Sequence, residues 1–222
     1  MILIPIPQEV IIIFQEKILK WAEFNLEKYP WRENRTPYSI MISEILLTRT
    51  NVAQVIPVYI KFMERYPILD EFLKASYDSL LDLIRTLGLL YRANKMTKLI
   101  KYIKENYDLK IPNSFSTLKS LPGIGDYGAN AILCFGYNKR EGLIDTNFIR
   151  IFSRLFNVNS KTKTSKSDKF LWNFAKKIVP ERNFIEYNYG IIDFANKVCS
   201  SKKPSCISCI LKELCFYYNK LC

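Results

Sequence analysis

The sequence predicts an all-α protein, and three observations carry that prediction. Apolar residues recur every three or four positions in most segments, which is the period of a helix with one buried face. These segments are separated by short connections that contain proline, glycine or serine. No convincing alternation of apolar and polar residues indicates a strand. With 222 residues and 49% hydrophobic content, the chain can build one large domain or two small interleaved ones.

The expected helices follow from this period and from the residues that interrupt it. Residues 8–29 form the first helix, which ends before Pro30, and Pro37 opens a second helix over 38–49. Further helices are expected over 52–66, 76–87, 92–107, 168–179 and 184–198. The stretch 157–169 is polar and rich in lysine, so a linker or mobile loop is expected there.

One segment has the pattern of two helices joined by a glycine turn. Ser116 is expected to cap a short helix, and Pro122 and the following glycines stop it, because proline lacks an N–H group and glycine permits positive φ. A second helix is expected from Asp126. The backbone amides of Gly123 and Gly125 can then hold a phosphate oxygen of DNA. An ordinary tight turn between packed helices is the alternative.

Two carboxylates are distinguished by their surroundings. Asp145 follows an apolar run and precedes a helical pattern, so it can cap that helix and still face a cleft. Glu44 shares a helix stripe with Ile40 and Leu47, and a half-buried acid is expected to have a raised pKa that suits proton donation. The alternatives are that Asp145 is simply a helix cap and that Glu44 is a boundary residue facing outward. Because the chain has no histidine, catalysis would rest on carboxylates, tyrosine, lysine or cysteine.

Four cysteines lie close together near the end of the sequence, in the spacing C-x6-C-x2-C-x5-C. They are Cys199, Cys206, Cys209 and Cys215. Four thiolates over so short a stretch can complete the coordination of a metal centre. Disulfides are the alternative, and the expected intracellular location argues against them. The spacing itself does not separate zinc from an iron–sulfur cluster.

The net charge points to a polyanionic partner. Lys and Arg outnumber Asp and Glu by 33 to 21, which gives a net charge of +12 and a pI near 9.4. Nucleic acid is the first candidate for such a partner and a membrane surface the second. The apolar start, 1–14, is broken by prolines, lacks a basic flank and is too short to span a bilayer. A cytoplasmic, nucleoid-associated protein without signal peptide or transmembrane segment is expected.

In their order along the chain, these motifs resemble the endonuclease III superfamily of helix-hairpin-helix DNA glycosylases. The matching stretches are YPWR (29–32), TPYSIMISEILLTRT (36–50), RTLGLLYRANK (85–95), the glycine turn, IDTNFIR (144–150), YNYGIID (187–193) and the four cysteines. The resemblance implies two helical lobes with a DNA cleft between them. A six-helix barrel with the hairpin would occupy 30–139. A second lobe would combine 1–29 with 140–222 and hold a 4Fe-4S cluster, in preference to zinc, in the loop 199–215.

The resemblance also implies the chemistry of the site. Asp145 corresponds to the aspartate that the superfamily uses for catalysis, and Tyr127 stands where the strand-cleaving branch has a lysine that forms a Schiff base. A phenol cannot form that imine, so a monofunctional enzyme is implied. Tyrosine at this position is similar to the archaeal thymine-DNA glycosylases that act on T/G mismatches. Tyr127 would line the base pocket.

Further roles are carried over from the same family. Glu44 and Asn188 are expected to hydrogen-bond the flipped base. Arg49 corresponds to a residue that inserts into the duplex where the base has left, and Leu89 resembles the wedge on the opposite strand. Thr48 and Arg49 replace the paired glutamines typical of the adenine-removing branch.

The sequence therefore predicts a monomeric DNA glycosylase of base excision repair. Its substrate would be double-stranded DNA with a mismatched or damaged base, and it would hydrolyse the N-glycosidic bond of a flipped thymine or uracil opposite guanine. An adenine mismatch glycosylase or an endonuclease III-like pyrimidine glycosylase is the enzymatic alternative. Adenine glycosylases that recognise oxidised guanine carry an extra C-terminal domain, whereas this sequence stops soon after its cysteines. A redox-sensing DNA-binding module is the non-enzymatic alternative.

Overall fold

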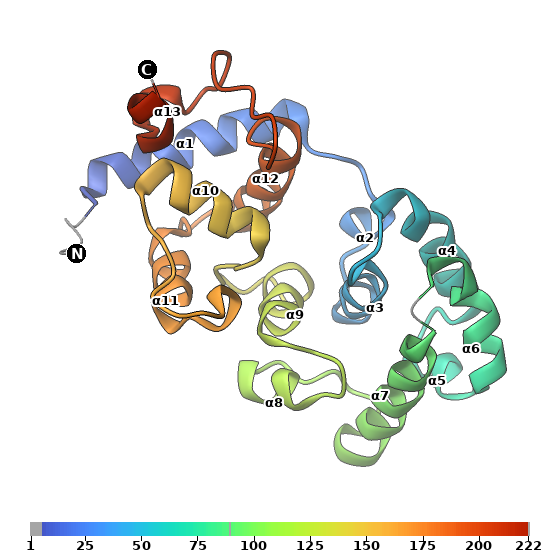
Figure 1. Ribbon diagram of the computed structural model, residues 1–222. Helices are drawn as coiled ribbons and strands as arrows, with labels where there is room; N and C mark the ends of the chain where they lie inside the picture. Colours follow the sequence, from blue (N-terminus) through green and yellow to red (C-terminus); the bar gives the residue numbers. More distant parts are fainter. Residues whose placement is uncertain (1–5, 89, 222) are drawn as a thin grey trace. The chain divides into compact units, whose positions relative to one another are not determined.

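The computed structural model describes residues 6–88 and 90–221, and its regular structure over these residues is entirely helical (Figure 1). The predicted all-α class is thereby confirmed. The chain divides into two compact units. One combines Met1–Glu27 with Arg140–Cys222, and the other is the continuous segment Lys28–Lys139.

The Lys28–Lys139 unit is built around one helix that is apolar on nearly every side. Its helices are α2 (Pro30–Glu33), α3 (Pro37–Leu47), α4 (Val52–Arg65), α5 (Leu69–Leu73), α6 (Tyr77–Ile84), α7 (Tyr91–Tyr107), α8 (Phe115–Ser120) and α9 (Asp126–Ala131), with a 3-10 turn at Arg85–Leu87 and a π turn at Ile132–Gly136. The central helix is α3, which packs against α4, α9 and the π turn. Its start is fixed by a capping box, in which Thr36 and Ser39 exchange side-chain to backbone hydrogen bonds of 2.9 and 3.0 Å.

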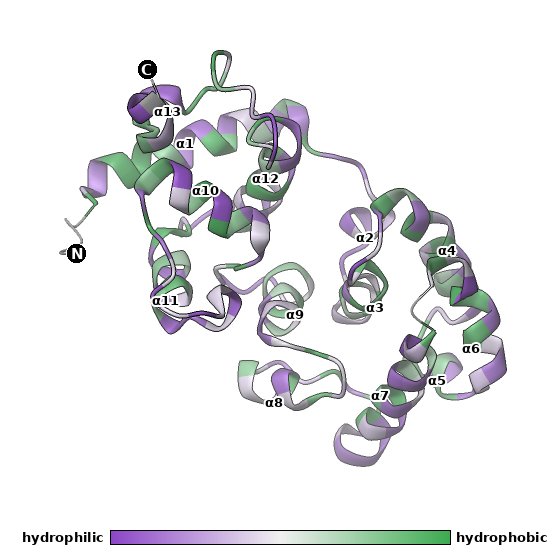
Figure 2. Cartoon of the chain, in the orientation of Figure 1, coloured by the Kyte–Doolittle hydropathy of each residue, from purple (hydrophilic) through white to green (hydrophobic). Residues whose placement is uncertain are grey.

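The other unit pairs the first helix of the chain with helices from its last third. These are α1 (Gln8–Asn25), α10 (Thr146–Phe156), α11 (Lys169–Ile178), α12 (Phe184–Lys197) and α13 (Phe216–Leu221), with 3-10 turns at Ser165–Ser167 and Lys212–Leu214. Helix α12 packs on both α1 and α10. Phe14 of α1 meets Tyr187 of α12 edge to face at 5.9 Å. Along α10 and α7, purple and green segments alternate, as amphipathic helices require (Figure 2).

Three local features differ from the sequence-based expectation. Helix α1 ends at Asn25 and not at residue 29, because Leu26 already has an extended conformation. The cap of α8 is Ser114 and not Ser116: the Thr117 amide donates to the Ser114 hydroxyl, so the expectation for Ser116 was wrong. The second helix of the hairpin ends in a π turn, which the sequence did not reveal.

Candidate functional site

Asp145 is the N-cap of α10, and both of its carboxylate oxygens are engaged. Oδ1 accepts hydrogen bonds from the amides of Asn147 at 2.7 Å and Phe148 at 3.0 Å, and Oδ2 accepts from the Asn147 side chain at 3.0 Å. Burial raises the pKa of Asp145 above its usual value, while the two amides and the charges of Lys166 and Arg150 work against that rise. The carboxylate is thus held rigidly at a helix N-terminus that favours its ionised form.

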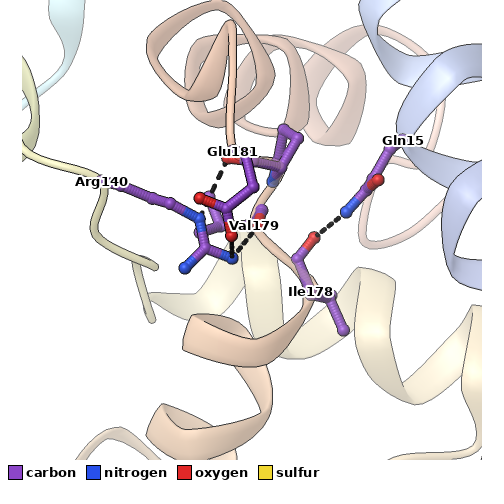
Figure 3. A network of polar contacts seen from close by, with 6 residues as sticks. Gln15, Arg140, Ile178, Val179 and Glu181 are labelled. Carbon is purple, nitrogen blue, oxygen red and sulfur yellow. Dashed lines mark hydrogen bonds and ion pairs between the residues drawn. The ribbon is translucent and has the colours of Figure 1, made fainter.

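The segment that leads to Asp145 is anchored to the C-terminal end of α11. The Arg140 side chain donates to the carbonyl of Pro180 at 3.2 Å and to that of Val179, and it lies 3.4 Å from a Glu181 carboxylate oxygen (Figure 3). Leu143 and Ile144, the two residues before Asp145, are fully buried. These contacts fix the chain immediately before the carboxylate, and packing behind it limits its movement.

A chain of hydrogen bonds runs along α10 from Asp145 to the cysteine segment. Asn147, which donates to Asp145, accepts from the Arg150 guanidinium at 2.9 Å. Arg150 also donates to the carbonyl of Cys199 at 2.8 Å and to that of Ala195 at 2.9 Å. One helix therefore joins the predicted catalytic carboxylate to the first of the four cysteines.

The four cysteines Cys199, Cys206, Cys209 and Cys215 line one cavity of about 30 Å³. Arg154 of α10 donates to the Cys199 sulfur at 3.4 Å, and the Leu211 amide donates to the Cys209 sulfur at 3.4 Å. Burial raises the pKa of the Cys209 thiol, and the other three sulfurs raise it further. A positive ion or cluster bound among these sulfurs would relieve that mutual repulsion.

The cysteines carry no disulfide in the part of the chain that the structure describes. In the same residues, no set of three or more Cys, Asp or Glu side chains is already arranged to hold a metal ion. The shared cavity and the two N–H donors aimed at sulfur are the features that fit a cysteine-held centre, because N–H groups near the sulfurs stabilise thiolate ligands.

The glycine turn of the predicted hairpin connects α8 to α9, with its glycines exposed. Gly123 has a φ of +89°, which side-chain-bearing residues rarely adopt. A Cβ built on Gly125 would meet no atom within 4 Å, so no other group crowds that side of the turn. Buried Ile124 anchors the turn between them, and its amide donates to the Leu121 carbonyl at 3.1 Å. In the first turn of α9, the Asp126 carboxylate is neutralised by Lys119, whose Nζ lies 2.5 Å from Oδ1.

The other predicted site residues of this unit lie on or beside α3 and α9. Glu44 is half-buried in the third turn of α3, and its carbonyl accepts from the Thr48 hydroxyl at 2.9 Å. Tyr127 is half-buried in the first turn of α9. Arg49 is exposed in the turn after α3 and has a φ of +57°. Leu89 lies outside the described residues.

Asn188 and Asp145 belong to the unit that combines Met1–Glu27 with Arg140–Cys222. Asn188 is 0% exposed in α12, and its side-chain nitrogen donates to the carbonyls of Glu141 at 3.0 Å and Phe184 at 2.8 Å. With its amide hydrogens used in this way, Asn188 ties α12 to the segment before Asp145. Its contact with a flipped base stays a prediction.

Sequence reasoning missed several residues that support this site. Lys166 acts on the Asp145 carboxylate from the loop before α11, and Arg150 and Asn147 link Asp145 to the cysteines. Arg92 of α7 is buried against the end of α3. The only signal for Arg92 was a charged residue at a position of α7 where the helical period places the core.

These features define a helical protein with a glycine hairpin and a capped carboxylate, and comparison identifies its family. The chain belongs to the HhH-GPD superfamily of base excision DNA repair proteins, whose family model matches residues 42–177. It is 37% identical over 212 residues to the thymine/uracil-DNA glycosylase of Pyrobaculum aerophilum, covering 93% of this chain and 92% of that protein.

Two further relatives bear on the same class. An adenine DNA glycosylase of Buchnera aphidicola is 36% identical over 213 residues, which cover 95% of this chain and 60% of that protein. The solved structure of a thermostable thymine-DNA glycosylase matches with a TM-score of 0.90 and 31% identity, covering 96% of this chain and 98% of the other. The predicted family and the predicted activity, that of a base excision DNA glycosylase, are confirmed. The partner of this class is DNA, and no helix within the described residues has the length and apolar character needed to cross a bilayer.

Proposed function

We propose that this protein is a monofunctional DNA glycosylase that releases thymine or uracil mispaired with guanine. The observation that carries the proposal is the Asp145 carboxylate, held by two backbone amides. The sequence adds a tyrosine, Tyr127, in the position where strand-cleaving relatives have lysine. The thymine/uracil-DNA glycosylase of Pyrobaculum aerophilum, similar over nearly the whole chain, supports the same substrate.

In the proposed reaction, the ionised Asp145 stabilises the positive charge that develops on the deoxyribose as the glycosidic bond breaks. The attacking water is oriented by the same carboxylate, adds to C1′ and releases one proton to the solvent, while the departing base takes up a proton. Glu44, whose raised pKa remains a prediction, is proposed to hydrogen-bond the base and supply that proton. Tyr127 is proposed to stack against the base, and it forms no covalent bond with the sugar.

The backbone amides of the exposed residues Gly123 and Gly125 are proposed to bind a phosphate of the duplex, which fixes position without reading sequence. Arg49 is proposed to enter the duplex where the base has left. The mispaired thymine or uracil costs less to extrude than a paired base, because its pairing is weak. We propose that the protein acts as a monomer, inside the cell where the genomic DNA lies.

We also propose that Cys199, Cys206, Cys209 and Cys215 hold a 4Fe-4S cluster, in preference to zinc. The shared cavity and the N–H donors to two sulfurs support this. When bound, the cluster supplies a rigid cross-link for the loop that follows α12. Aerobically purified protein should then show broad visible absorption and about four irons per chain; a colourless protein with one zinc would contradict the proposal.

A panel of duplexes tests the activity directly. Under single-turnover conditions, the protein should release the base from T/G and U/G pairs, and strands should break only after alkali treatment, because no Schiff base forms. Borohydride should trap no covalent complex. Asp145→Asn is the matched inactive control. Release of oxidised pyrimidines alone, or strand cleavage without alkali, would contradict the proposed reaction.

The adenine DNA glycosylase of Buchnera aphidicola, with 36% identity, favours a second candidate function, the release of adenine mispaired with guanine. An A/G duplex in the same panel addresses it. Faster release of adenine from A/G than of thymine from T/G would replace the proposed substrate with adenine and leave the roles of Asp145 and the glycine hairpin unchanged.

A further inference from the structure

Arg92 is a charged residue buried in the core side of α7. Its side chain is 2% exposed, among the most buried of the large side chains that the structure describes. Nη1 donates to the carbonyl of Leu46 at 2.9 Å, and Nη2 donates both to the carbonyl of Thr48 and to the hydroxyl of Thr50. One guanidinium thus spans the end of α3 and the turn that follows it.

These contacts satisfy carbonyls at the C-terminal end of α3. The last four carbonyls of a helix have no partner within the helix, and this end carries the negative pole of the helix dipole. Thr48 donates to the carbonyl of Glu44 and the Thr50 amide to that of Leu47, while Arg92 satisfies those of Leu46 and Thr48. Burial lowers the pKa of the Arg92 guanidinium, while its interaction with Tyr91 works against that change. The carbonyls replace part of the water that burial removes from around the charge.

The turn held in this way is the one that presents Arg49. Arg49 lies between the two threonines that Arg92 binds, and its φ of +57° is left-handed, which is unfavourable for a residue with a side chain. Such a conformation persists only where the surroundings over-determine it, and it is often found at functional sites. The Arg92 contacts on both sides of Arg49 supply that restraint, and the Arg49 side chain remains exposed.

We propose that Arg92 is a positioning residue: by holding Thr48 and Thr50, it fixes the backbone of Arg49 in the conformation that enters the duplex. This inference rests on the proposed function, in which Arg49 takes the place of the departed base. A turn fixed before binding loses less conformational freedom when Arg49 inserts, so insertion and base extrusion become faster. Without Arg92, Arg49 would keep its charge and lose its preset direction.

Arg92→Met removes the guanidinium and keeps much of its volume. We expect single-turnover release of thymine from a T/G duplex to fall by about tenfold or more, since small misplacements of positioning groups cost up to about 100-fold. Lys101→Met is the matched control: it removes one positive charge from the exposed, opposite face of α7 and should leave the rate unchanged.

A double-mutant cycle separates positioning from general damage to the fold. If Arg92 acts through Arg49, then Arg92→Met should slow the Arg49→Ala variant by less than about twofold, because the group being positioned is already gone. An equal loss of rate in both backgrounds would overturn the proposal. Thr50→Val removes the hydroxyl that Arg92 binds. It should lower the single-turnover rate by a smaller factor, and this effect too should largely disappear in the Arg49→Ala background. This second variant keeps the test usable if Arg92→Met does not fold.

Hydrogen exchange gives a readout that does not depend on catalysis. The Thr50 amide, which donates to the Leu47 carbonyl at 3.2 Å, should exchange faster in Arg92→Met and in Thr50→Val, while amides in α12 remain unchanged. If the wild type released no base from any duplex, the proposed function would fail. Faster exchange of the Thr50 amide in the two variants would still show that Arg92 holds the turn. Unchanged Thr50 exchange together with an unchanged rate would overturn the positioning role itself.

Discussion

At the scale of single residues, the protonation of Asp145 affects the stability of the fold and the proposed activity in opposite directions as the pH changes. Its folded pKa is raised by burial, so between the ordinary carboxyl pKa and the raised one the folded state binds more protons than the unfolded state. Stability contributed by Asp145 therefore falls as the pH rises through this window, whereas the proposed activity, which needs the carboxylate, rises.

Asp145→Asn tests this opposition. The amide oxygen can still cap α10, so we expect DNA binding to persist and the melting temperature near neutral pH to be unchanged or higher. Base release should fall by on the order of 10²–10³-fold or more, because the developing positive charge loses its counter-charge. Calorimetry and single-turnover kinetics measure the two effects. A variant that is less stable and fully active would contradict both expectations.

Lys166 offers a second residue-scale prediction. Its ammonium lowers the pKa of Asp145, so Lys166→Met should raise that pKa further and move the acidic limb of the rate profile to higher pH. Lys163→Met, which removes the same charge from the same loop, serves as the control and should leave the limb in place. The measurement is the pH dependence of single-turnover base release. Equal shifts in the two variants would indicate a general charge effect.

Residues with supporting roles were the part of the site least accessible from sequence. The cap position of Asp145 and the grouping of the cysteines could be predicted because they depend on local patterns, a helix start and a tight spacing. Their chemical roles stay predictions. Arg92 and Arg150 act on carbonyls 46 and 49 positions away, respectively. No periodicity in the sequence reports such a partner.

At the scale of elements, two glycines of similar appearance in the sequence have different roles. A Cβ on Gly142 would lie 2.5 Å from the carbonyl carbon of Ala175 in α11, whereas one on Gly125 would meet nothing within 4 Å. Gly142 allows the segment before Asp145 to pack closely against α11, and Gly125 leaves the hairpin open to a ligand.

The pair Gly142→Ala and Gly125→Ala tests these roles. We expect Gly142→Ala to destabilise the protein by about 1–3 kcal/mol, because backbone must move to admit the methyl group. Gly125→Ala should change stability by less than about 0.5 kcal/mol and weaken duplex binding, since its Cβ would crowd the phosphate. Denaturant unfolding and DNA titration measure both. Equal destabilisation by the two substitutions would show that Gly125 also has a packing role.

Helix interiors were predicted better than helix ends, for a physical reason. The helical period reports one buried face, and it placed α1, α3, α4 and α7 in the expected segments. The ends depend on which side chain reaches a free amide, and Ser114, not Ser116, does so for α8. Asp168 shows the same limit: it accepts from the Lys161 amide and the Ser160 hydroxyl, and so ties down part of the segment expected to be a linker.

At the scale of the whole molecule, the net charge of +12 predicts a steep dependence of DNA binding on salt. Each phosphate that the protein neutralises releases bound counterions, so affinity should fall by about tenfold or more between roughly 50 and 200 mM salt. Titrations of a duplex with and without a T/G mismatch measure the slope. A binding constant that does not vary with salt would contradict an interface built on phosphate contacts.

The pairing of distant segments in one unit has a consequence for synthesis on the ribosome. Helix α1 emerges first, but α12, which covers its apolar side, is translated only after the entire Lys28–Lys139 unit. That middle unit has all of its own helices available and can fold while the nascent chain is still growing. Until α12 is synthesised, the apolar side chains of Phe14 and Ile18 lack this cover. Helix α1 is therefore the segment of this protein that is exposed longest to chaperone binding and to aggregation.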